Sequence, residues 1–258
     1  MDHVIEKLVE YRVLAQKHTA PVKATATATL RAAANAEEFV QRIQDEAQIE
    51  VQVISGFREA SLVYAGVRHG LPDLEEQGLL CVDVGGGSTE LASGSADRAQ
   101  FLTSIAVGTL VVHRRWLGFE EISSNEVKRA RKGLIKRLKP HALFAVKNPM
   151  THHVCTGGSA QRIAKIARII EGKPDAEIHG YPLSTACLDA VIARVVGART
   201  SEGRKAIPGM DPERANQLLG GAIIYRELSR LMALEQWTVS MSAIRTGMIL
   251  ELDEQVNG

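Results

Sequence analysis

Hydrophobic and polar positions change period several times along this chain of 258 residues. After Asp2, apolar residues recur near every 3.6 positions, which predicts a first helix with Asp2 at its cap. Residues 22–27 alternate apolar and polar side chains, the period of a half-buried strand. Asn35 followed by Glu38 resembles a capping box and predicts a helix over residues 36–46.

The same reading applied to the remainder predicts strands and helices in alternation, typical of an α/β fold. The predicted strands are residues 51–54, 79–82, 89–92, 99–103, 153–156 and 238–240. The predicted helices are residues 57–68, with Ser55 as the N-cap, and 109–117, 125–138, 159–170, 183–196, 212–234 and 243–252. Residues 73–77 are largely polar and predict a hinge, so we expect a first lobe over residues 1–76 and a second over residues 77–258.

The segment around Gly85, Gly86 and Gly87 carries the clearest chemical signal. It lies between two predicted strands, and three consecutive glycines can take φ > 0 and bring backbone N–H groups close to a ligand. Together with the Ser88 hydroxyl, such N–H groups form an anion-binding nest. The spacing matches neither a P-loop nor the G-x-G-x-x-G fingerprint, because Glu90 stands where the third glycine belongs. The spacing therefore argues against a dinucleotide-binding Rossmann site.

A carboxylate stands on each side of this turn, Asp83 before it and Glu90 after it. Both would repel a bound phosphate unless a cation lay between them, and a hard divalent ion prefers oxygen ligands of this kind. The alternative is a plain β-hairpin in which Asp83 satisfies turn amides. The paired carboxylates favour a metal-bridged phosphate site.

A second glycine turn, Gly157-Gly158, follows a predicted buried strand and precedes a predicted helix. The N–H groups at a helix N-terminus suit a phosphate or a nucleotide, although a simple strand-to-helix turn has the same sequence. Residues 128–139, which precede this turn in the sequence, carry seven lysines and arginines. These basic residues fit either a solvated helix face or an anion-attracting surface.

Composition restricts the classes of partner. A formal net charge of +1 gives no reason to expect binding to nucleic acid or to a membrane surface. Three cysteines lack metal-ligand spacing, and the first residues do not form a signal peptide. We therefore expect a cytoplasmic protein.

Five motifs occur in the order found in the exopolyphosphatase/guanosine pentaphosphate phosphatase (Ppx/GppA) family, and nearly the whole chain resembles it. They are residues 25–31 with 34–35, residues 53–56 with 59–60, residues 83–91, residues 156–158, and residues 238–240 with 244–247. The resemblance implies the actin-like ATPase (ribonuclease H-like) superfold, with two lobes and a central cleft. It also implies a Mg²⁺-dependent (or Mn²⁺-dependent) phosphohydrolase that removes terminal phosphate from polyphosphate or guanosine pentaphosphate.

Residue roles follow from the same resemblance. Glu59 matches the general base for the attacking water, and Asp83 and Glu90 match the metal-binding carboxylates. Arg31 would reach the site from the first lobe, and phosphate would be held by Gly85, Gly86, Gly87, Ser88, Gly157 and Gly158. Taken alone, Glu59 could equally belong to a solvated helix face and Arg31 to a loop salt bridge.

The chain also departs from the family pattern. The sequence lacks the Asp-x-Gly-Ser-Asn-Ser loop with which the family opens, so we expect an N-terminally shortened first lobe with an exposed sheet edge, weak activity and self-association, for example as a homodimer. Arg58 replaces a residue that is often acidic, and Asn216 replaces a common Asp. A non-catalytic phosphate- or nucleotide-binding protein is the main alternative, and a kinase of the same superfold fits less well.

Overall fold

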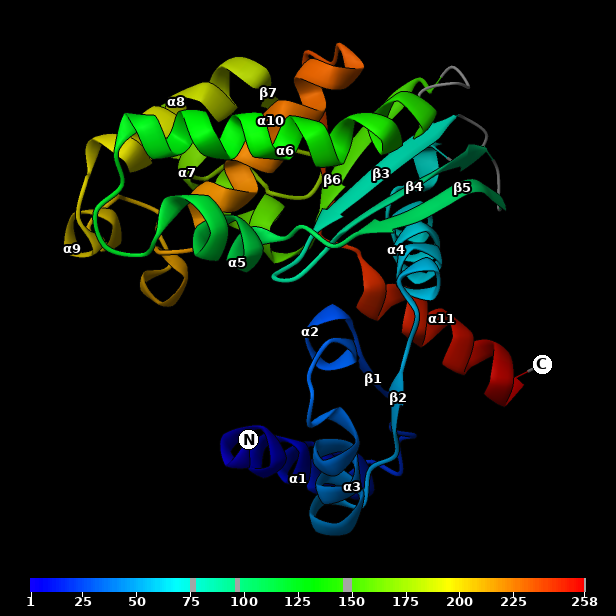
Figure 1. The fold of residues 1–258 in the computed structure, drawn as a ribbon. Helices are drawn as coiled ribbons and strands as arrows, with labels where there is room; N and C mark the ends of the chain where they lie inside the picture. Colours follow the sequence, from blue (N-terminus) through cyan, green and yellow to red (C-terminus); the bar gives the residue numbers. More distant parts are fainter. Residues whose placement is uncertain (75–77, 96–97, 146–149, 258) are drawn as a thin grey trace.

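The computed structural model describes residues 1–74, 78–95, 98–145 and 150–257. Its main element is a six-stranded sheet in the order β5-β4-β3-β6-β8-β7 (Figure 1). β3, β4 and β5 form an antiparallel meander, whereas β6 and β8 continue from β3 in parallel. The strands are β3 (Leu79–Val84), β4 (Thr89–Ser95), β5 (Arg98–Ile105), β6 (His152–Thr156), β7 (Pro182–Ser184) and β8 (Gln236–Val239).

Helices cover both faces of this sheet, and the two faces have separate apolar cores. Leu80, Val82 and Val84 of β3 pack against the larger set of helices, whereas Leu79 and Cys81 pack against α4 (Gly56–Gly70). This alternation follows from the two-residue period of a strand. The larger set comprises α5 (Thr109–Val112) with the π-helical turn His113–Leu117, α6 (Ser124–Ala145), α7 (Gly157–Ile170), α8 (Thr185–Gly197) and α10 (Leu218–Met232).

A smaller unit lies below the large sheet in Figure 1. It contains α1 (Asp2–Lys17), β1 (Ala24–Ala26), α2 (Ala28–Arg31), α3 (Ala36–Ala47) and β2 (Val51–Val53). β1 and β2 pair in parallel, and Ile5, Ile43, Ala47 and Ile49 form a separate small core. We call this unit the small lobe, and the large sheet with its helices the large lobe.

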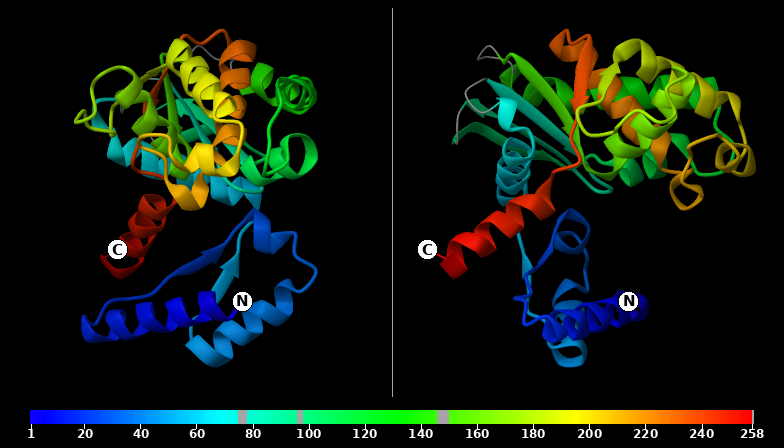
Figure 2. Two further views of the ribbon diagram at one scale, coloured as in Figure 1. Left: turned by 90° about the vertical axis from the view of Figure 1, so that its left-hand side faces the viewer. Right: turned by 180° about the vertical axis from the view of Figure 1, so that it is seen from behind.

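Two helices connect the lobes. α4 follows β2 directly and packs on the large sheet, and α11 (Ile244–Asn257) packs along α4 and extends toward the small lobe (Figure 2). Glu251 of α11 pairs with Lys23 of the small lobe at 2.9 Å. The division of the chain at residue 76 stays a prediction; residues 75–77 of the predicted hinge lie outside the described residues, and Pro72–Leu74 forms a short 3₁₀ turn.

The structure corrects several predicted elements. The helix predicted over residues 183–196 begins at Thr185, because its first residues form the edge strand β7. The helix predicted from residue 212 is interrupted: Pro212–Arg214 forms a 3₁₀ turn and α10 begins at Leu218. The short helix α9 (Ser201–Lys205) was missed. Ser55 caps α4 as predicted, accepting a hydrogen bond from the Arg58 N–H, whereas Asn35 makes no side-chain cap bond.

Within the described ranges, every helix is too short or too polar to cross a membrane.

Candidate active site

The two predicted metal-binding carboxylates lie side by side on the large sheet. Asp83 on β3 and Glu90 on β4 are direct cross-strand partners, so their side chains emerge on the same face. Ser104 on β5 and Thr156 on β6 extend this row on either side. The Ser104 hydroxyl donates to Glu90 Oε1 at 2.7 Å and fixes that carboxylate.

The start of α4 brings Glu59 to the same face. Gly56 begins this helix directly against β5, where an added Cβ would lie 2.3 Å from Ser104 Cβ. The close approach requires glycine and places Glu59 one helical turn later, near both carboxylates of the row. Glu59 is 9 % exposed, and its Oε2 makes no hydrogen bond to any described residue.

The three carboxylates influence one another electrostatically. Burial, followed by the negative charges of Glu90 and Glu59, raises the pKa of Asp83 to about 8. Burial and Glu59 raise the pKa of Glu90 to about 7. Burial also raises the pKa of Glu59, although the Arg31 guanidinium, 3.6 Å from Glu59 Oε2, opposes that rise. Additional positive charge nearby is therefore needed for all three carboxyl groups to be ionised near neutral pH.

A divalent cation would fit this donor set. Carboxylate oxygens are the ligands of Mg²⁺ and Mn²⁺, and Mg²⁺ is held by one or two carboxylates together with water and substrate phosphate. Across the part of the chain that the structure describes, no three Asp, Glu, His or Cys side chains converge on one point. Asp83 and Glu90 could thus supply two ligands and leave positions open, and the metal site stays a prediction.

The first glycine turn is held from behind by the N-terminus of α5. The carbonyls of Gly85 and Gly86 accept hydrogen bonds from the N–H groups of Thr109 and Leu110, both at 2.9 Å. The positive φ that the sequence permits is not used here: none of Gly85, Gly86 and Gly87, all within the described residues, adopts the left-handed conformation. Gly86 and Gly87 lie close to α5 and α2, where an added Cβ would be 3.3 Å from Leu110 Cδ1 and 3.3 Å from Ala28 Cβ, respectively.

A glycine that we did not predict permits this packing. An added Cβ at Gly108 would lie 2.5 Å from the carbonyl carbon of Gly86. Gly108 is the N-cap residue of α5, so its lack of a side chain lets the helix approach the glycine turn. The short sequence around Gly108 gave no signal of this role, because the contact depends on a segment that lies earlier in the chain.

The second glycine turn meets Asp83 directly. Gly157 has φ +79°, and an added Cβ would lie 2.0 Å from Asp83 Oδ1. α7 begins at Gly157 rather than at Ser159, so both glycines lie in its first turn. The Ser159 hydroxyl donates to the Val84 carbonyl at 2.7 Å and joins the two turns. Gly157 thus reserves the space that the Asp83 carboxylate occupies.

If the chain catalyses the phosphohydrolase reaction that its resemblance implies, replacing Gly157 by alanine should lower turnover by about 10²-fold, because a displaced Asp83 loses its alignment. Gly172→Ala is the matched control: Gly172 also has a positive φ, +71°, but an added Cβ meets nothing within 4 Å. Both variants should lose thermal stability from backbone strain, and Gly157→Ala should lose more because its Cβ also displaces Asp83; calorimetric melting measures the difference. Equal turnover in the two variants would contradict a role for Gly157 in placing Asp83.

A cavity of about 810 Å³ opens beside these turns. Asp83, Gly85, Gly86, Gly157 and Gly158 line it. The other predicted residues, Glu59, Glu90, Arg31, Gly87 and Ser88, are not among its lining residues. Arg31 instead donates to the Ile54 carbonyl at 2.6 Å and faces Glu59.

The cavity is also lined by three arginines that were not predicted from the sequence to belong to the site: Arg162, Arg214 and Arg245. Arg162 lies one turn after Gly158 on α7, and helical side chains point back toward the N-terminus. Its guanidinium therefore lies over the second glycine turn, where a Cβ at Gly158 would lie 2.5 Å from Arg162 Nη1. The spacing of four residues after the Gly-Gly pair is the signal that could have found it.

A buried tyrosine holds the strand ends together behind the site. The Tyr225 hydroxyl on α10 donates to the Thr156 carbonyl at 2.9 Å and accepts from the Val84 N–H at 3.3 Å. These groups adjoin Gly157 and Asp83 in the sequence. Because the contact crosses from α10 to two strands, no local pattern could predict it.

The two departures from the family pattern have structural consequences. Arg58 points away from Glu59 and pairs with Glu251 on α11, so it does not neutralise the predicted base directly. Asn216 Oδ1 accepts a hydrogen bond at 2.8 Å from Arg204, a guanidinium with no exposed surface. Burial lowers the pKa of Arg204.

The fold and the site together define an α/β protein of the actin-like ATPase fold with a carboxylate-rich site beside two glycine turns. The chain belongs to the Ppx/GppA phosphatase family, whose model matches residues 1–255. This membership and the similar structures below confirm the sequence-based resemblance and support a phosphohydrolase.

Solved structures of the family are similar over almost the whole chain. The Aquifex aeolicus Ppx/GppA family member is 26% identical, with a TM-score of 0.82, and the match covers 100% of this chain and 82% of that protein. A second structure of the Aquifex aeolicus enzyme is 27% identical, with a TM-score of 0.80 and coverage of 97% and 82%. An exopolyphosphatase from Cytophaga hutchinsonii, at 24% identity, shares the fold with a TM-score of 0.88 and coverage of 99% and 82%.

Proposed function

We propose that this chain releases terminal phosphate from inorganic polyphosphate or from guanosine pentaphosphate by metal-assisted attack of water. The observation that supports this proposal best is that Glu59, Asp83 and Glu90 lie on the same face of the sheet, close enough that, in addition to burial, the charges of Glu90 and Glu59 raise the pKa of Asp83. A cluster of carboxylates beside two glycine turns suits a site that holds metal and phosphate together.

We assign to each residue the role that the family resemblance implies. Glu59 accepts the proton of the attacking water, since its raised pKa brings it closer to neutral pH. Arg31 orients Glu59 and adds positive charge beside the reacting phosphoryl group. The two glycine turns, with the Ser88 hydroxyl, bind non-bridging oxygens. Asp83 and Glu90 would hold Mg²⁺ or Mn²⁺, which when bound supplies charge neutralisation at the phosphoryl oxygens.

Phosphate release tests this function. Purified chain should release orthophosphate from long-chain polyphosphate or from guanosine pentaphosphate with Mg²⁺, and lose that activity when EDTA removes the metal. The substrate that supports the higher kcat/KM is the assigned one. Binding of both compounds without any release would contradict hydrolysis and favour the phosphate-binding alternative.

We also propose self-association and a cytoplasmic location. β1 and β2 form a sheet of only two strands in the described part of the chain, so each has a free edge that a second copy could extend. Cys81, Cys155 and Cys187 are buried free thiols, which suits a reducing compartment. Sedimentation velocity should show a dimer that a Val53→Pro substitution on the edge strand weakens; a monodisperse monomer at every concentration would contradict the homodimer.

A further inference from the structure

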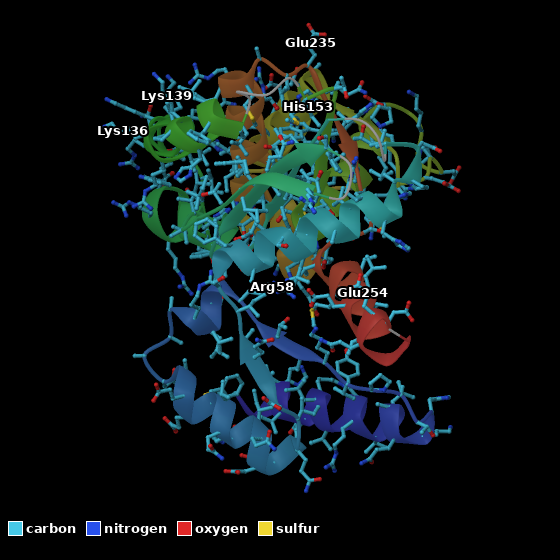
Figure 3. The ribbon with its side chains drawn as sticks, turned by 90° about the vertical axis from the view of Figure 1, so that its right-hand side faces the viewer. Arg58, Lys136, Lys139, His153, Glu235 and Glu254 are labelled. Carbon is cyan, nitrogen blue, oxygen red and sulfur yellow. The ribbon has the colours of Figure 1, made fainter. Side chains whose placement is uncertain are left out.

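The basic residues of α6 divide into an inward and an outward set. Arg131 faces inward, 3.8 Å from Asp189 and 3.7 Å from Glu227, and Arg137 donates to the Ala106 carbonyl. The outward set is exposed along one side of the helix, and we call it the basic face: Lys128, Arg129, Lys132, Lys136 and Lys139. Figure 3 shows Lys136 and Lys139 projecting outward from the large lobe, whereas Arg58 lies next to the small lobe.

The basic face is not neutralised by its surroundings. Among the described residues, its four lysines form no ion pair, and Arg129 has a single acidic partner, Glu126, at 4.0 Å. Glu120 and Glu121 precede the helix on its N-terminal side, where Glu120 acts on the buried Arg204. From Lys128 to Lys139 the face extends about 16 Å at the helical rise. A protein of net charge +1 therefore concentrates positive charge on this one helix.

The π-helical turn after α5 packs against the middle of α6. Gly133 has no side chain, and the Trp116 ring packs there, within 2.5 Å of where a Cβ would be. The Arg115 guanidinium lies over that ring, 5.6 Å from its centroid. Arg115 thus adjoins the middle of α6, and it lies in the π-helical turn that continues α5, the helix of the cavity-lining Leu110. Arg115 therefore supplies one positive charge between the cavity wall at Leu110 and the helix that carries the basic face.

We propose that the basic face, together with Arg115, binds a stretch of a linear polyphosphate chain whose terminal phosphate lies in the cavity. The proposal rests on the proposed function and specifies a preference for long chains. Lysine ammonium groups on flexible stems suit a charged chain without a fixed sequence of contacts. Single-stranded nucleic acid fits less well, because base stacking needs free aromatic rings. Here Trp116 is covered by Arg115, and Phe144 packs on Phe101.

The test compares two triple variants with the same change in net charge. Lys132→Gln, Lys136→Gln and Lys139→Gln together remove the basic face, whereas Lys17→Gln, Lys173→Gln and Lys205→Gln remove exposed lysines elsewhere. Glutamine keeps helix propensity. We expect the first variant to raise KM for long-chain polyphosphate about tenfold, because exposed ionic contacts are individually small. Its KM should also depend less on salt concentration than the KM of the control. Its kcat, and its kinetics on tripolyphosphate, should match those of the control.

Direct binding separates this proposal from the proposed function. The same substitutions are placed in the Glu59→Gln background, and binding of fluorescent long-chain polyphosphate is measured by anisotropy. Weaker binding only in the basic-face variant supports the proposal. If the native chain also hydrolyses no substrate, that result contradicts the proposed hydrolase activity but not the binding of polyphosphate by the basic face. Equal binding in both triple variants would overturn the proposal, and so would single-stranded RNA that displaces polyphosphate from the face at equal charge concentration.

Discussion

Substituting glutamine for Glu59 should lower turnover by roughly 10²–10⁴-fold while substrate still binds. Glutamine has the same shape and keeps the contact with Arg31, but it cannot accept the proton of the attacking water. Steady-state phosphate release gives the turnover, and calorimetric titration with polyphosphate gives the affinity.

The exposed Glu177→Gln provides a matched control with the same chemical change. Its turnover should equal that of the native chain. If Glu59→Gln also retains near-native turnover, Glu59 is not the base, and its burial beside Arg31 is a structural feature of α4.

The second large effect is expected at Asp83. Asp83→Asn should abolish binding of Mg²⁺ or Mn²⁺ in the presence of phosphate, because it removes one of the two charged ligands beside the glycine turns. Isothermal calorimetry with the native chain and with the exposed Asp175→Asn control should give the same metal affinity. Undiminished metal binding by Asp83→Asn would refute the ligand assignment.

The raised pKa of Asp83, about 8, adds a dependence on pH. A carboxyl group whose pKa is raised on folding contributes stability that is complete below its unfolded-state pKa and is lost as pH rises through the folded value. The metal-free native chain should therefore lose stability as pH rises toward 8, and Asp83→Asn should flatten this profile. Because metal binding requires the ionised carboxylate, apparent affinity for Mg²⁺ should increase over the same range.

The pairing of the two carboxylates could be predicted from the sequence. The turn of Gly85 to Ser88 is short and placed symmetrically between the strands, so Asp83 and Glu90 become cross-strand partners on one face. The Ser55 cap of α4 is also a local feature, and it was predicted correctly.

Other features of the site depend on contacts between distant segments. The sequence allows Gly85 to Gly87 a positive φ, but none of them adopts one; Gly86 and Gly87 instead lie close to side chains of α5 and α2. The Tyr225 hydroxyl and the close approach of Gly108 come from helices whose positions only the folded chain defines. Arg214 lies in none of the five motifs, and Arg245 lies in the motif of residues 244–247 without a role implied by the resemblance; the structure brings both to the cavity.

Hydrolysis in isotopically labelled water tests the central claim most directly. The native chain is incubated with Mg²⁺ and with polyphosphate or guanosine pentaphosphate in water enriched in heavy oxygen, and the released orthophosphate is analysed by mass spectrometry. Attack of water on the terminal phosphoryl group predicts one solvent-derived oxygen in each orthophosphate released. No release from either substrate, or orthophosphate that carries no solvent oxygen, would contradict the account.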